Sequence, residues 1–528
     1  MNWKASGYSG AVAAGGIEAV AAGISLLEKG GNAADAAVGT LLALSVTDYG
    51  MYAIGGEIPF MIYDAKVRKV RVLSGLGSAP LDSHAIEWYR NNGIPSNGGI
   101  KAAPVPGAPS LCFVALQKFG TVSFAQAAIP TLNLLDKGKE PWHPYLAKTF
   151  RRLIETEKIT AGPREEKLQA ARDRFYKGDI ADELVAFYTD KGSFLRKQDM
   201  VSHVIYEEDS VTTDYRGYTV CKCGSWTQRP YLLQTLQLLE GFDLNSLGHA
   251  SAEYIHLLSE ALKLGLADRD EYYGDPRFEN VPLEALLSDQ YTEIRRALID
   301  MKSASVEIRP GDPIAMSAVK GTGTYRPGPG GTTTCVVADR WGNLVAATPS
   351  GNGPNAICEK LGVAHGNRLR SLNTTPGHPN CIKSGKRPRI TLTPTLVLKE
   401  GKPVMAISVA GGDIQDQTTL NCLLNTIEFD MLPENAVRAP RFCTGHHQDS
   451  FNADPQRENT LVKLTSLTLG EEIPQSVKDD LRSHGYRIET SKVPIATPVM
   501  LMRDPDSGLV YAAGDPKAGR HAAAVIGD

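Results

Sequence analysis

The stretch from Gly331 to Asp339 carries residues whose types and order suggest chemistry. A run rich in glycine and proline (321–331) leads into Thr332, and the residues after it predict a strand, a turn at 339–343 and a second strand over 344–348. If the Gly331–Thr332 bond is cut, Thr332 becomes a new N-terminus. Its hydroxyl is then a nucleophile, and its own amine is the neighbouring base. The alternative interpretation is an ordinary loop and β-hairpin, because such a motif needs its structural context.

A tandem glycine, Gly411-Gly412, is the second feature that could do chemistry. It follows an apolar strand predicted over 404–409 and precedes a helix predicted over 418–427. Such a junction presents backbone N–H groups beside a helix N-terminus, where they can hold an oxyanion. The competing interpretation is a tight turn that needs glycine only for its backbone dihedral angles.

The elements that must position these residues are helices and strands in succession. Two alanine-rich helices are predicted, over 17–27 and from 33 towards 45, with glycines at 30–31 ending the first. Runs at 58–63 and 68–73 predict a hairpin, and 121–210 reads as mostly helical with solvated faces of mixed charge. A long helix over 252–273 ends in Asp268, Arg269 and Glu271, which are either catalytic or ion-paired scaffolding.

Composition narrows the class of protein. The chain has 528 residues, 42% hydrophobic and 22% charged, which is typical of a globular protein with a large core, and its length alone would allow three or four domains. A net charge of -3 without a basic tail argues against nucleic acid or anionic membranes as partners. We find no secretory signal and no apolar run long enough to span a bilayer. Eight scattered cysteines indicate a reduced, cytoplasmic protein rather than a disulfide framework.

Cofactor motifs are missing from the sequence. There is no strong dinucleotide fingerprint, phosphate-binding P-loop or zinc-protease helix motif. The pairs Cys221/Cys223 and His446/His447 lack the spacing of a zinc cluster. We therefore predict no cofactor and no metal.

Ten runs, in order, then indicate a family. They are Leu27–Ala37, Val105–Gly107, Asp214–Tyr218, Ala267–Arg269 with Gly274–Pro276, Thr332–Thr333 with Asp339 and Gly342–Asn343, Lys386–Pro388, Thr393–Thr395, Gly411–Gly412, Ala439–Phe442 and Gly514–Pro516. Over almost its whole length the chain resembles the γ-glutamyltransferase family of N-terminal nucleophile hydrolases.

The resemblance implies an α+β fold, a four-layer αββα sandwich, formed by a single domain over 1–528. It also implies an inactive precursor that cuts itself between Gly331 and Thr332. The products would be a large piece, 1–331, and a small piece, 332–528, whose strands lie in the same two sheets.

The resemblance also assigns roles within the site. Thr332 is the expected nucleophile, Ser350 matches a hydroxyl that binds the new N-terminus, and Gly411 and Gly412 match the glycines that face the oxyanion. Asn352 matches an asparagine of the acyl pocket. Thr348 shares an alternating face with Ser350, so we expect it to support the site.

Departures from the family bear on the substrate. The segment 73–80 lacks the arginine that holds a glutamyl α-carboxylate in the family. Ser371 stands where an acid binds the α-amino group, and Ile390-Thr391 replaces a serine pair. Glu57 interrupts the family's glycine run, and its role is not evident from the sequence. The short segment between Pro376-Gly377 and Lys386 predicts an open cleft without a lid.

Arg368 and Arg370 add positive charge close to these positions. They are either a fork for a substrate carboxylate or surface ion-pair partners, since arginine is usually exposed. The expected substrate-binding residues are Asn352, Thr348, Arg368, Arg370, Ser371 and Thr391.

The sequence thus favours a self-processed threonine amidohydrolase acting on a small, carboxylate-bearing amide, as relatives do on oxamate or glutaryl-type side chains. Its expected partners are that substrate and the two pieces of its own precursor, and a homo-oligomer of the processed pair is left open. One alternative is a conventional γ-glutamyl hydrolase or transferase. The other is a non-catalytic family member used for binding.

Overall fold

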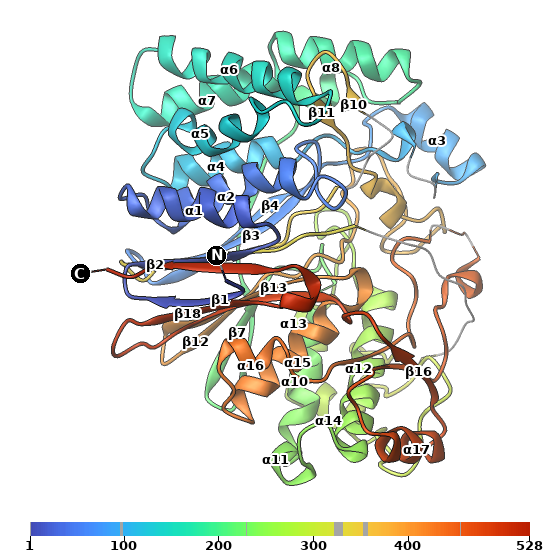
Figure 1. The fold of residues 1–528 in the computed structure, drawn as a ribbon. Coiled ribbons are helices and arrows are strands. Elements are labelled where there is room, and N and C mark those ends of the chain that lie inside the picture. Colours follow the sequence, from blue (N-terminus) through green and yellow to red (C-terminus); the bar gives the residue numbers. More distant parts are fainter. Residues whose placement is uncertain are drawn as a thin grey trace.

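A computed structural model describes residues 2–95, 99–228, 230–320, 331–351, 357–452, 454 and 456–527. Two seven-stranded antiparallel sheets are stacked face to face, and helices cover the outer face of each (Figure 1). The predicted α+β class is confirmed, with two large antiparallel sheets.

The first sheet has the order β19-β2-β8-β9-β3-β4-β5, and the second has the order β1-β18-β17-β13-β12-β7-β6. The strands of the first sheet are β2 (Gly10–Ala14), β3 (Ile58–Asp64), β4 (Lys69–Gly75), β5 (Tyr206–Asp209), β8 (Cys335–Asp339), β9 (Leu344–Ala347) and β19 (His521–Val525). Those of the second are β1 (Lys4–Gly7), β6 (Val211–Tyr215), β7 (Tyr218–Lys222), β12 (Thr395–Lys399), β13 (Lys402–Ala410), β17 (Thr497–Arg503) and β18 (Val510–Gly514). Each sheet therefore interleaves strands from both sides of the Gly331–Thr332 bond.

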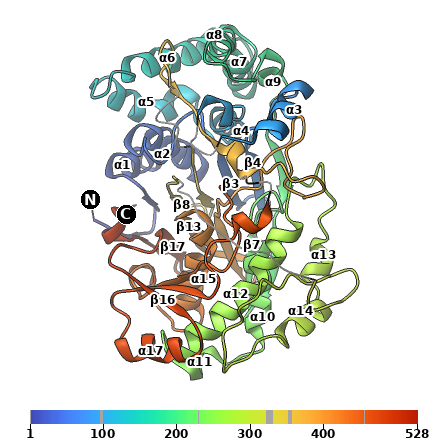
Figure 2. The same ribbon diagram turned by 90° about the vertical axis from the view of Figure 1, so that its right-hand side faces the viewer.

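Helices from the first half of the chain cover the first sheet (Figures 1 and 2). They are α1 (Ile17–Glu28), α2 (Ala33–Thr47), α4 (Ala108–Phe119), α5 (Phe124–Leu135), α6 (His143–Ile159), α7 (Arg164–Tyr176) and α8 (Asp179–Asp190), with α3 (Ser83–Asn92) and α9 (Lys197–Val201) to the side. As predicted, 121–210 is mostly helical, and the two alanine-rich helices are α1 and α2.

Helices on the other side cover the second sheet (Figure 2). They are α10 (Pro230–Glu240), α11 (Leu244–Leu247), α12 (Ala252–Tyr272), α13 (Leu283–Leu286), α14 (Asp289–Arg296), α15 (Gln415–Ile427), α16 (Pro433–Ala436) and α17 (Gln475–Ser483). Among them, α10, α15 and α16 contact its strands directly. The remaining elements are β10 (Ile357–Cys358), β11 (Val363–Ala364), β14 (Phe442–Thr444), β15 (Ser466–Gly470), β16 (Arg487–Ser491) and the 3-10 helices η1 (Ile100–Ala102), η2 (Arg368–Ser371), η3 (Gly412–Ile414), η4 (Arg457–Thr460) and η5 (Pro516–Ala518).

Local chemistry explains why α2 and the β8–β9 hairpin sit together. Asn32 caps α2 by accepting from the Asp35 amide, and Asp35 accepts from the Asn32 amide in return. Asp339 accepts from the backbone amide and the side chain of Asn343, which fixes the hairpin turn. The same Asp339 accepts from the Ala33 amide at the start of α2, at 2.9 Å. One carboxylate thus ties the hairpin that follows Thr332 to the helix above it.

Small apolar side chains fill the space between the sheets, including alanines of β2, β8, β9 and β18. Asn2 pairs with Ala522, so the two ends of the chain lie side by side (Figure 2). Within the described part of the chain, no helix combines the length and the apolar character that crossing a membrane would need.

Candidate active site

Thr332, Ser350 and Glu57 are neighbours across the first sheet, just beyond the ends of β8, β9 and β3. Thr332 and Ser350 form one antiparallel bridge, and Ser350 and Glu57 form another. The Glu57 amide donates to the Ser350 carbonyl at 2.9 Å, and the Ser350 amide donates to the Glu57 carbonyl at 3.0 Å. The strand order of the sheet therefore continues to the site, and backbone register sets the spacing of the three side chains.

Polar groups from two elements surround the Thr332 hydroxyl. Its Oγ1 lies 3.4 Å from Ser350 Oγ, and Gln415 Nε2 donates to it at 3.4 Å. The adjacent Thr333 donates its hydroxyl proton to Asp48, a carboxylate that also pairs with Arg520 at 3.3 Å. Thr333 is thus held firmly, while the Thr332 hydroxyl makes only long contacts with the described residues.

The tandem glycine is linked to Thr332 through Gln415, which contacts the Thr332 hydroxyl and is the first residue of α15, shortly after the two glycines. β13 ends at Ala410, and the chain turns through Gly411 and Gly412 into η3 and then α15. Gly412 has φ +64°, and a Cβ there would lie 3.2 Å from the Phe451 ring. Both the dihedral angle and the close ring thus require glycine at this position.

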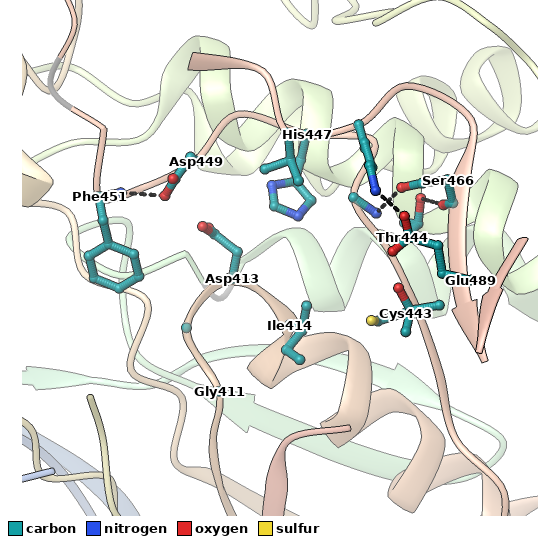
Figure 3. A pocket seen from close by; sticks show the side chains of 15 residues that line it. Gly411, Asp413, Ile414, Cys443, Thr444, His447, Asp449, Phe451, Ser466 and Glu489 are labelled. Atoms are coloured by element: carbon teal, nitrogen blue, oxygen red, sulfur yellow. Dashed lines mark hydrogen bonds and ion pairs between the residues drawn. The ribbon is translucent and has the colours of Figure 1, made fainter. Parts of the chain in front are cut away.

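A pocket of about 440 Å³ opens beside this turn and is lined by Gly411, Gly412, Asp413 and Phe451 among others (Figure 3). Asp413 anchors the turn, accepting from Arg269 at 2.5 Å and from the Ser450 amide at 3.0 Å. Burial opposes ionisation of Asp413, yet attraction by Arg269 lowers its pKa to about 2. The turn is therefore fixed by a carboxylate that stays charged at neutral pH.

Arg368 and Arg370 lie in η2 and are only 4% and 8% exposed. Their interpretation as surface ion-pair partners is therefore wrong. Arg368 Nε donates to Glu57 at 2.6 Å, and both guanidinium groups lie over Phe451, at 5.4 and 4.8 Å from its centroid. The arginines are buried because an internal carboxylate and an aromatic face replace water around them.

The two arginines are not fully paired. Arg368 Nη1 and Arg370 Nε have no hydrogen-bond partner among the described residues. Burial, and then repulsion by Arg368, lower the pKa of Arg370 from 12.5 to about 10. A buried pair of cations with unused donors is suited to binding an anion.

The other predicted residues are placed as follows. Thr348 is fully buried and its hydroxyl lies 2.8 Å from Ser408 Oγ, so it contacts the second sheet. Ser371 is buried beside Arg370, and its hydroxyl has no partner among the described residues. Thr391 is buried, and its carbonyl accepts from Gln228 at 3.0 Å. Asn352 lies outside the described residues.

Charged residues at the end of α12 are ion-paired, as one of the two interpretations expected. Asp268 pairs with Arg295 at 3.2 Å, Arg269 pairs with Asp413, and Glu271 pairs with Lys320 at 3.0 Å. Arg269 belongs to the scaffold behind the glycine turn, because its partner Asp413 anchors that turn.

Sequence reasoning missed Gln415, Phe451 and the contact between Glu57 and Arg368. Gln415 could have been found, since the first helical residue after a candidate oxyanion turn must lie near the nucleophile. Glu57 and Arg368 carry opposite charges, but they are 311 residues apart, and no sequence pattern pairs residues at that distance. Nothing in the sequence pointed to Phe451.

The stacked antiparallel sheets place a threonine just before β8 of one sheet and a glycine turn just after β13 of the other, an arrangement suited to acyl-transfer chemistry. A family model described as Gamma-glutamyltranspeptidase matches residues 19–167 and 140–525. The chain therefore belongs to the γ-glutamyltranspeptidase family, which confirms the predicted resemblance, and it is an enzyme of that family.

Individual relatives align over nearly the whole chain. The "Glutathione hydrolase proenzyme" of Bacillus subtilis (strain 168) is 30% identical, over 98% of this chain and 92% of its own length. The "Acylase ACY 1 proenzyme" of Pseudomonas sp. (strain SE83) is 29% identical, over 96% of this chain and 92% of its own length. The solved structure of LmbA2991HD is 31% identical with a TM-score of 0.88, covering 98% of this chain and 99% of that one.

Proposed function

We propose that the protein is a self-cleaving hydrolase with an N-terminal threonine nucleophile, and that it hydrolyses a small amide that carries a carboxylate and has no γ-glutamyl head. Cleavage would separate a large piece, 1–331, from a small piece, 332–528. Relatives that align end to end are named as proenzymes, which supports maturation by cleavage.

The proposed catalytic cycle uses Thr332 and the glycine turn, and Gln415 at the start of α15 links the two. Thr332 Oγ1 attacks the substrate carbonyl while the freed Thr332 amine takes its proton; a terminal amine has a pKa of about 7.7–8.0, so it is an effective base near neutral pH. The N–H groups of the Gly411-Gly412 turn stabilise the oxyanion. The proton then passes to the leaving amine, and water resolves the acyl-enzyme.

The observation that carries the substrate class is the buried arginine pair, with donors at Arg368 Nη1 and Arg370 Nε that lack partners among the described residues. A carboxylate would relieve the repulsion between these cations and accept from their free N–H groups. The α-ammonium of a γ-glutamyl head would meet two cations, and at the position of the family's acid it would find only Ser371.

The experiment combines processing with a substrate panel. A gel and N-terminal sequencing of purified protein should show two pieces, the smaller starting at Thr332, and Thr332→Ala should stay intact and inactive. The processed protein is then tested on amides with a free terminal carboxylate, on their methyl esters and on a γ-glutamyl anilide.

Each outcome decides between the candidates. Preference for the free acids supports the proposal, whereas turnover of the anilide with no preference for free acids favours a conventional γ-glutamyl enzyme, as the glutathione hydrolase relatives suggest. An intact wild-type chain with no activity would favour a binding role. If Thr332→Ala were still cut before residue 332, the proposed maturation would be wrong.

A further inference from the structure

A continuous chain of contacts runs from Glu57 to the carbonyl oxygen of Gly331. Glu57 Oε1 accepts from Arg368 Nε at 2.6 Å, and Arg368 Nη2 donates to Ser350 Oγ at 2.6 Å. Ser350 Oγ in turn donates to the Gly331 carbonyl at 2.5 Å. The chain of contacts thus ends on the carbonyl of the bond that the proposed maturation breaks.

The direction of these hydrogen bonds is fixed by chemistry. A guanidinium can only donate, so Ser350 must accept from Arg368 and is left to turn its own proton towards Gly331. A hydroxyl that accepts from a cation is also a stronger donor, because hydrogen bonds in a chain polarise one another. Arg368 therefore sets both the orientation and the strength of the Ser350 donor.

Glu57 holds Arg368 in this role. Its backbone pairs with Ser350 through two hydrogen bonds, so the carboxylate and the serine are held one strand apart. All three residues, Glu57, Arg368 and Ser350, are at most 4% exposed, so water does not compete for their contacts.

We propose that Glu57 and Arg368 are positioning residues for self-cleavage. They orient and polarise Ser350, whose hydroxyl stabilises the negative charge that develops on the Gly331 oxygen. Thr332 Oγ1 bonds to the Gly331 carbonyl carbon, the C–N bond breaks, and the hydroxyl proton ends on the Thr332 nitrogen. Water then hydrolyses the resulting ester to a Gly331 carboxylate and a free Thr332 hydroxyl. The inference rests on the proposed cleavage between Gly331 and Thr332.

The test follows cleavage of freshly made precursor, produced by cell-free synthesis and sampled over time on a gel. Ser350→Ala should slow cleavage by about 100- to 1000-fold, the range for loss of one oxyanion donor. Arg368→Met keeps the serine and should slow it by about 10- to 100-fold, and Glu57→Gln by less. Arg368→Lys should cleave within about tenfold of wild type, and methylguanidinium should partly restore cleavage of Arg368→Ala.

A matched control exists in the outer helices. Arg172 is also buried, at 7% exposed, and its Nε donates to the hydroxyl of Ser110 at 2.8 Å. Arg172→Met therefore removes a similar buried guanidinium–serine contact away from Thr332, and it should cleave at the wild-type rate. Circular dichroism checks that each precursor is folded. If the Arg368→Met precursor is not folded, the cleavage rates of Glu57→Gln and Arg368→Lys test the positioning role instead.

The inference is overturned if folded Arg368→Met cleaves within twofold of wild type, or is slowed no more than Arg172→Met, or if methylguanidinium restores nothing. These results can be distinguished from those that would refute the proposed function. A wild-type chain that is never cut before Thr332 refutes both, whereas normal cleavage in wild type and in all Glu57 and Arg368 variants refutes only the positioning role.

Discussion

Replacing Arg370 by methionine should lower kcat/KM for amides with a free carboxylate by about 10- to 150-fold. The structure sets the scale, because the pKa of Arg370 falls from 12.5 to about 10. At about 1.4 kcal/mol per pH unit, keeping this buried side chain charged costs on the order of 3 kcal/mol. A bound carboxylate recovers part of that cost, and hydrogen bonds to charged groups contribute about 1.5–3 kcal/mol, which corresponds to the stated range.

The assay compares each free acid with its methyl ester in wild type, Arg370→Met and Arg370→Lys. The methionine variant should lose activity on the acid and keep it on the ester, and the lysine variant should retain part of the preference. Because Arg370 loses its proton as pH rises through about 10, the wild-type preference for the acid should fall there. Equal losses on acid and ester in Arg370→Met would refute the carboxylate site.

Three further predictions concern the frame around the site. Gly412→Ala keeps the backbone N–H but strains a turn with φ +64° and crowds Phe451, so it should cost about 1–2 kcal/mol in stability. Displacement of the turn's N–H groups should lower kcat by about 100-fold. Thermal unfolding and kinetics measure the two effects, and a destabilised variant with unchanged kcat would show that this turn does not hold the oxyanion. Burial lowers the pKa of His365 from 6.5 to about 3, so the unfolded chain binds a proton below pH 6.5 that the native one does not. The free energy of unfolding should therefore decrease by about 2 kcal/mol as the pH is lowered from 7.5 to 5. In His365→Phe, urea unfolding should show a decrease that is smaller by this amount. Asp48→Asn should destabilise by about 2 kcal/mol because it removes the carboxylate that pairs with Arg520, with less than additive loss when combined with Arg520→Met.

Elements with local chemical signals could be predicted from the sequence. The glycine that ends α1 acts within one turn of the chain, and the strand, tandem glycine and helix at 402–427 follow each other directly. Boundaries were less accurate: α15 begins at Gln415, three residues before the predicted start.

Contacts between distant segments could not be predicted. Glu57 and Arg368 are 311 residues apart, and no spacing rule in a single sequence pairs residues at that distance. The expectation that Arg368 and Arg370 could be surface residues rested on the usual exposure of arginine. It failed because Glu57 and Phe451, both far away in sequence, provide the charge and the ring that stabilise the buried guanidinium groups.

The interleaving of strands in both sheets affects how the cleaved protein refolds and how it is inactivated. Under the proposed maturation the sheets form while the backbone is continuous, so folding is unimolecular. After cleavage, neither piece can dissociate without breaking the backbone hydrogen bonds between its strands and those of the other piece. Two denatured pieces would have to associate again before they could refold. Renaturation yield should then depend on concentration only for the matured form, and its working lifetime should be governed by the rate of unfolding rather than by an equilibrium.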